Sequence, residues 1–204
     1  MPTDESPDVV KSVEIEKLKA DAENGVARAQ YLLARCFFYG MGVAKDESAA
    51  LTWAERAACQ NYADGANLIS VYYFEKALKD GDYAESNKWG FRAIALGSLK
   101  AMLNYTRRYQ FGKGVEVDEE MAVRLARVAG VCGFREAQFQ YGLYLLGGIG
   151  VKRNLEEGER WIKIAAKNGC KEALDYFKGV DDVVTKAMED SMYALRLQCE
   201  ADEI

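Results

Sequence analysis

The sequence contains no histidine, and this absence removes many catalytic designs at once. Histidine is the usual general base of serine and cysteine hydrolases and a frequent ligand of zinc. A thiol nucleophile therefore has no histidine to activate it. We expect no catalytic residues, no metal site and no cofactor.

Proline is almost as scarce, since Pro2 and Pro7 are the only two in the chain. The rest of the sequence is free of the residue that most strongly breaks helices. Glycine occurs 18 times instead. This combination indicates a chain of many helices that end at glycine.

Paired cysteines and long apolar runs are also missing. The five cysteines form no CxxC pair, and no signal peptide is visible, which favours reduced thiols in the cytosol. We expect them to be small buried residues: Cys36, Cys59, Cys132, Cys170 and Cys199. The longest nearly apolar run, 141–151, is far short of the ~18 residues that suggest a membrane span. A net charge of −5 disfavours nucleic acid as a partner. These observations predict a cytoplasmic protein without a membrane span.

What the sequence does contain is a repeat of 36 residues. Trp53 and Trp89 are separated by 36 residues, Trp161 follows 72 later, and Leu125 occupies the remaining position. Two further columns keep the same interval: Ala29, Gly65, Ala101, Ala137 and Ala173, and Gly25, Asn61, Gly97, Gly133 and Gly169. So many aligned columns indicate a repeat architecture.

Each repeat predicts two helices joined by a corner. In the first repeat Ala29, Leu33 and Phe37 recur every four residues, which is typical of one face of a helix. The stretch YGMGVAKD (39–46) follows, and a second helix carries Trp53. A glycine-rich phosphate loop needs a strand before it, whereas here a helix precedes the glycines. The corner also recurs at 112–115 and 148–151, so we interpret it as architecture.

The residues after each corner predict how the second helix begins. Good N-cap residues recur there: Asp46, Asp82, Asp118 and Asn154. Asp82 with Glu85, and Asn154 with Glu157, have the spacing of a capping box. The second repeat has KALK (76–79) in place of the glycines, so its first helix is expected to run about one turn longer, to Gly81.

The patterns AxAxxxLAxxF, GxGVxxD and AxxWxxxAA resemble the SEL-one-like repeat (SLR), a member of the tetratricopeptide-type α/α solenoids. The resemblance covers roughly residues 9–180. It implies an all-α fold, a right-handed α/α superhelical solenoid of about four helix-turn-helix repeats with capping helices. We predict a disordered 1–8, a solenoid over 9–180 and a C-terminal capping helix over 181–204. The solenoid divides into a half repeat and four repeats: 9–25, 26–61, 62–97, 98–133 and 134–169.

The resemblance also implies a non-catalytic scaffold or adaptor that binds a protein or peptide on the concave face formed by the first helices. Mapped onto this sequence, the expected peptide-binding residues are Arg28, Tyr31, Arg35, Phe38, Tyr39, Asn67, Val71, Phe74, Asn104, Arg107, Phe111, Phe139 and Gln140. Charge alternates along this face in three groups: Arg28 and Arg35, then Asp64 and Glu75, then Lys100, Arg107 and Arg108. A partner with acidic residues would fit the basic groups.

Two other functions compete with the scaffold. Some cysteine-rich relatives of the family are associated with β-lactam hydrolysis, so a β-lactamase-like hydrolase or a regulatory subunit of an enzyme is one alternative. No SxxK motif supports the hydrolase. The other is a homo-oligomeric structural protein that uses Met188, Met192 and Leu195.

Overall fold

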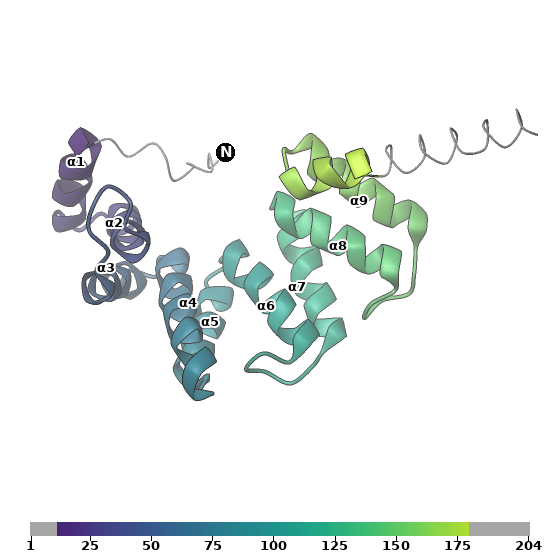
Figure 1. Ribbon diagram of the computed structural model, residues 1–204, viewed down its shortest axis with the longest axis horizontal. Coiled ribbons are helices and arrows are strands. Elements are labelled where there is room, and N and C mark those ends of the chain that lie inside the picture. Colours follow the sequence, from purple (N-terminus) through teal and green to yellow (C-terminus); the bar gives the residue numbers. More distant parts are fainter. Residues whose placement is uncertain (1–11, 180–204) are drawn as a thin grey trace, which may run out of the picture. The chain divides into compact units, whose positions relative to one another are not determined.

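The computed structural model describes residues 12–179, and every regular element in this stretch is a helix (Figure 1). The predictions of a disordered 1–8, a capping helix over 181–204 and an oligomer contact at Met188 lie outside the described residues. The helices are α1 (Ser12–Glu23), α2 (Ala27–Tyr39), α3 (Glu47–Cys59), α4 (Ala63–Asp80), α5 (Ala84–Ala95), α6 (Leu99–Phe111), α7 (Glu119–Val131), α8 (Arg135–Gly147) and α9 (Leu155–Lys167). Residues 171–179 are helical as well.

The chain divides into two compact units, Met1–Leu125 and Ala126–Ile204, called unit 1 and unit 2 below. In unit 1 each helix packs on the next, from α1 to α6, and α2, α4 and α6 also contact one another in succession. In unit 2 the main helix pair is α8 with α9. The all-α repeat fold expected from the sequence is confirmed.

The helix starts follow the predicted period closely. The first helices of the four pairs begin at Ala27, Ala63, Leu99 and Arg135, each 36 residues after the one before. After each second helix the chain turns through the left-handed region at Asn61, Gly97, Gly133 and Gly169, with φ between 59° and 88°. These are the residues that accept that conformation most easily, so the expected helix stops are confirmed.

The Gly-x-Gly corner is a hydrogen-bonded turn. In the first corner Gly40 and Gly42 both have a φ of 70°. The N–H of Asp46 donates to the carbonyl of Phe37 (3.0 Å), and its Oδ1 accepts from the N–H of Ala49 (2.9 Å). The same pair of bonds recurs at Asp118 and at Asn154. The three corners therefore end one helix and cap the next.

The second repeat differs in the expected way. α4 has 18 residues where α2 has 13, and it ends at Gly81, whose φ is 79°. The prediction for Asp82 is wrong, however, because Tyr83 holds the N-cap position of α5. The Oδ1 of Asp82 accepts from the N–H of Ala84, two residues on, instead of capping with Glu85. Without the Gly-x-Gly turn, α5 starts one residue later than the period requires.

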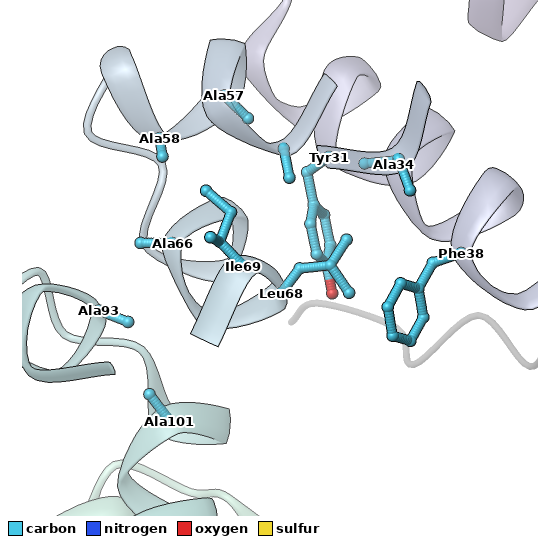
Figure 2. Close-up of a cluster of buried hydrophobic side chains, with 12 residues drawn as sticks. Tyr31, Ala34, Phe38, Ala57, Ala58, Ala66, Leu68, Ile69, Ala93 and Ala101 are labelled. Carbon is cyan, nitrogen blue, oxygen red and sulfur yellow. The ribbon is translucent and has the colours of Figure 1, made fainter. Parts of the chain in front are cut away.

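Small residues bring the helices of unit 1 close together. Figure 2 shows the central cluster, in which Leu68 and Ile69 of α4 lie among alanines from neighbouring helices. Ile69 is completely buried, which contributes roughly 1.5–3 kcal/mol. A Cβ on Gly65 would lie only 2.9 Å from the Cβ of Ala57, so this position requires glycine.

The cysteine prediction is only half right. Cys36 and Cys170 are buried, whereas Cys59 and Cys132 are exposed. Cys59 is the last residue of α3, and Cys132 lies in the turn directly after α7. Cys199 lies outside the described residues.

Candidate functional site

The predicted binding residues fall on the first helix of each pair, and all but Phe139 and Gln140 lie in unit 1. There they are carried by α2, α4 and α6, three helices that contact one another in order. We call the surface these three helices share the A-helix face. It is the part of the described chain where side chains from three repeats meet.

A bridge over α4 ties the three helices together. The Nζ of Lys100 on α6 donates to the phenol oxygen of Tyr31 on α2 at 3.2 Å. The same Nζ lies 3.5 Å from Oδ2 of Asp64 on α4. Packed helices are roughly 8–10 Å apart, so Tyr31 and Lys100 meet only by reaching across α4. Tyr31 is 6% exposed, with its ring also 5.4 Å from that of Tyr62, so the bridge forms the closed end of the face.

Electrostatics favour the charged form of Lys100 in this position. Burial alone lowers the pKa of Lys100, because it removes water from the ammonium. Tyr31 and Asp64 act in the opposite direction, and together they hold the pKa above its ordinary value. The bridge is therefore built around a cation at neutral pH.

Further contacts continue along the line where α4 meets α6, which we call the α4–α6 seam. Ser98 donates from Oγ to Oδ1 of Asp64 (2.6 Å), and Asn104 donates from Nδ2 to Oδ1 of Asn67 (3.2 Å). Asn67 is buried and Asn104 half-buried. The predicted asparagines thus lie together, and the amide oxygen of Asn67 is engaged inside the protein.

The face is open at the other end, near the last turns of the helices. Tyr39 is 55% exposed and Phe111 is 62% exposed, and Arg107, four residues before Phe111, is exposed as well. Arg35 is half-buried, with its guanidinium 5.7 Å from the ring centre of Tyr31. Aromatic rings and arginines at a surface are typical of binding sites.

The pKa of Tyr39 shows which charges surround it. Partial burial raises the pKa, Arg35 lowers it, and Glu75 raises it again; the net shift is upward. The charge of Lys100 also lowers the pKa of Tyr39. The open end of the face therefore carries both signs of charge close to one exposed ring.

The remaining predicted residues of unit 1 have different environments. Arg28 is exposed, and its charge opposes the burial that raises the pKa of Tyr62. Phe38 is buried, with its ring edge-on to the ring of Tyr39 at 4.8 Å between centres. Val71 is half-buried against the cluster of Figure 2. Of these, Arg28 has the accessibility that a partner needs.

Arg108, expected among the exposed basic groups, lies inside the protein. It is 4% exposed, and its guanidinium carbon is 4.0 Å from the ring centre of Phe74 and 4.5 Å from that of Tyr105. Its Nη1 donates to Oγ of Ser86 (2.8 Å) and to the phenol oxygen of Tyr105 (3.1 Å). Burial lowers the pKa of Arg108. The 36-residue period carries a signal that could have found this, because Arg108 occupies the repeat position of Cys36 and Tyr144, which are both buried.

In unit 2 the two predicted residues lie on an apolar surface. Phe139 and Gln140 are both half-buried on α8, and the ring of Phe139 is edge-on to that of Tyr176 at 6.3 Å between centres. Phe139 packs against the cluster around Ile162. No ion pair or hydrogen bond comparable to the bridge connects Phe139 and Gln140 to other residues within the described part of unit 2.

The described residues can be checked for a metal site, a reactive thiol and a membrane-spanning helix. No group of His, Cys, Asp and Glu residues within 12–179 has an arrangement that could hold a metal ion. Burial raises the pKa of the Cys36 and Cys170 thiols, which opposes the reactive thiolate form. No described helix is long and apolar enough to cross a membrane.

A sequence profile for the Sel1 repeat matches residues 27–62, 68–82, 99–130 and 135–170. These segments make up more than half of the chain. The match in the second repeat is the shortest, in the repeat that lacks the Gly-x-Gly corner.

Several known proteins are similar to this chain. The chitin synthase regulator SKT5 of Saccharomyces cerevisiae is 28% identical, over 89% of this chain and 27% of its own length. An exopolysaccharide production negative regulator of Rhizobium meliloti is 27% identical, over 83% of this chain and 55% of its own length. The crystal structure of a Sel1 repeat protein from Oxalobacter formigenes matches with a TM-score of 0.65 and 28% identity, over 84% of this chain and 50% of that chain. This chain thus spans between about a quarter and about half of the curated relatives it matches.

Proposed function

Because the chain belongs to the Sel1 repeat family, we propose that it is a non-catalytic scaffold whose A-helix face binds a segment of another protein. Proteins of this family are generally interaction or regulatory scaffolds, and the two curated proteins described above are named as regulators. A regulator without chemistry of its own acts by holding a partner. The described cysteines are all free, which supports the cytoplasm as its location.

One observation carries the proposal: the Tyr31–Lys100 bridge places side chains of α2, α4 and α6 on one continuous face. Such a surface is what an extended segment needs, because it offers contacts over several repeats at once. The exposed rings of Tyr39 and Phe111 supply apolar area at the open end of this face.

The chemistry of the face favours an acidic partner. Arg28, Arg35, Lys100 and Arg107 are accessible or half-buried on it, against the carboxylates of Asp64 and Glu75. Asp64 and Lys100 already pair with each other, which leaves Arg28, Arg35 and Arg107 against Glu75. The surplus is therefore positive, although the whole chain carries −5. We propose that the partner segment combines acidic with apolar residues.

A labelled eight-residue peptide of alternating glutamate and leucine tests this proposal, with the glutamine–leucine peptide as its neutral counterpart. We expect the acidic peptide to bind more tightly. We expect the double variant Arg35→Glu, Arg107→Glu to lower its affinity at least tenfold, since like charges facing each other cost several kcal/mol. Fluorescence anisotropy measures both.

The matched control reverses two exposed charges on second helices, Lys88→Glu and Arg124→Glu, and changes the net charge equally. We expect this control to bind like the wild type apart from a small general charge effect. Equal losses in both double variants would mean that net charge, and not the A-helix face, attracts the peptide.

A further inference from the structure

Arg108 is a buried charge without a counter-charge. Among the described residues no aspartate or glutamate forms an ion pair with it, and the groups that influence its pKa are the phenols of Tyr105 and Tyr83. Its compensation consists of two neutral hydrogen bonds and two aromatic faces. A charge removed from water is normally paired, so the guanidinium of Arg108 lacks the negative partner that such a site usually has.

The guanidinium also has donors to spare. Both of its hydrogen bonds leave from Nη1, which leaves Nε and Nη2 without a protein acceptor among residues 12–179. Every fully buried side-chain nitrogen or oxygen in that stretch has a hydrogen-bond partner. It follows that Nε and Nη2 account for part of the 4% of Arg108 that reaches the surface. These two nitrogens form the edge of the guanidinium that pairs with both oxygens of a carboxylate.

Arg108 itself lies on the α4–α6 seam, which belongs to the proposed binding surface. Along the α4–α6 seam, Asp64 meets Lys100, Asn67 meets Asn104, and Phe74 meets Arg108 in turn. The seam therefore runs from the closed end of the A-helix face to Arg108. The exposed Phe111 follows three residues later on the same helix.

We infer that Arg108 binds the carboxylate of an acidic side chain of the partner segment through Nε and Nη2. The inference rests on the proposed function and specifies its main polar contact. The rings of Phe74 and Tyr105 hold the guanidinium plane in place, so the side chain loses little conformational freedom when the two hydrogen bonds form. The aromatic surroundings also exclude water, which strengthens the ion pair.

A purely structural role for Arg108 makes a different prediction. If Arg108 becomes Met, the hydroxyl of Ser86 still donates to the carbonyl of Ser70, and the phenol of Tyr105 still donates to Oδ1 of Asn87. No buried polar group loses its last partner. We therefore expect Arg108→Met to unfold at the same temperature as the wild type or higher, and to bind the acidic peptide at least tenfold more weakly. An Arg that only supports the fold would show the reverse pattern.

The experiment uses the glutamate–leucine peptide with the wild type, Arg108→Met and Arg108→Lys, and compares each with the glutamine–leucine peptide. Lys keeps the charge and the stem but lacks the two-pronged edge, so we expect a loss of about threefold to tenfold. In a ¹⁵N NMR spectrum the Nε–H signal of Arg108 should shift with the acidic peptide and not with the neutral one. This signal reports contact even if Arg108→Met fails to fold.

The outcomes separate this inference from the proposed function. If the wild type does not prefer the acidic peptide, the proposed acidic partner is wrong and the Arg108 site falls with it. If Arg35→Glu with Arg107→Glu abolishes binding while Arg108→Lys binds normally and the Nε–H signal does not move, the face binds the segment and Arg108 takes no part. Loss of affinity in both Arg108 variants with an intact fold supports the site.

Discussion

The helix pairs α4–α5 in unit 1 and α8–α9 in unit 2 cross at equivalent repeat positions but use different chemistry. In α4–α5 the crossing residues are Ser70 and Ser86, and each hydroxyl donates to the backbone carbonyl of the other, at 2.8 and 2.9 Å. In α8–α9 they are Gly142 and Gly158. A Cβ on Gly142 would lie 2.6 Å from Cγ1 of Ile162 and 2.9 Å from the carbonyl of Gly158.

The difference shows that one packing position accepts two solutions. Glycines allow the backbones themselves to touch, and the neighbours at that crossing are apolar. Serines fill the space with hydrogen bonds, and the hydroxyl of Ser86 then becomes an acceptor for Arg108. The polar crossing is thus what makes a buried arginine possible in unit 1.

The largest expected effect on stability comes from replacing a glycine at the α8–α9 crossing with the serine found at the α4–α5 crossing. We expect Gly142→Ser to lower the free energy of unfolding by about 2 kcal/mol, because the new atoms overlap Ile162 and a backbone carbonyl. Urea unfolding followed by circular dichroism measures this. Gly130→Ser is the control, since a Cβ there meets nothing closer than 3.4 Å. A cost below 0.5 kcal/mol at Gly142 would mean that α8 and α9 separate easily.

Removing the hydroxyls of the serine crossing should have a smaller effect, and an unequal one. Ser86→Ala loses a bond to Ser70 and an acceptor for a charged group, so we expect about 1.5 kcal/mol. Ser70→Ala loses hydrogen bonds to neutral groups only, the carbonyl of Ser86 and the phenol of Tyr105, and we expect about 1 kcal/mol. In the Arg108→Met background the two costs should become equal. If the difference between the two costs persists in the Arg108→Met background, its cause is something other than the bond to Arg108.

The smallest effect concerns how the second helix of each pair begins. Asn154 caps α9 by accepting from the N–H of Glu157, so Asn154→Ala should cost about 1 kcal/mol. Asp82 makes a two-residue turn before α5, and Asp82→Ala should cost only a few tenths of a kcal/mol. Hydrogen exchange of the first turns of α5 and α9 measures both. Similar costs would show that Asp82 stabilises α5 as a cap despite its geometry.

The sequence predicted the period, the helix pairs and the long α4 because each has a local cause. Glycine at a left-handed turn, or its loss at 76–79, acts within one turn of the chain. The prediction that Asp82 is the N-cap of α5 was wrong, because the Gly-x-Gly corner that sets the start of the second helix is missing from this repeat. Local patterns therefore describe this fold well wherever the repeat is regular.

The candidate site was less predictable because it depends on contacts between repeats. The sequence pattern gives Tyr31 and Asn67 the same outward positions as Tyr39 and Arg107, yet the first two are buried. Both engage residues of the third repeat: Tyr31 accepts from Lys100, 69 residues later, and Asn67 accepts from Asn104, 37 residues later. No pattern within one repeat contains that information, and the binding role of these residues stays a prediction.

The Tyr31–Lys100 bridge has a consequence for how the molecule folds. In an ideal repeat protein each repeat contacts only its neighbours, so stability is a sum of nearest-neighbour couplings and the ends can unfold independently. Here a hydrogen bond connects the first repeat to the third. This coupling favours cooperative unfolding of the first three repeats, because loss of the first repeat also removes the phenol that Lys100 of the third repeat bonds.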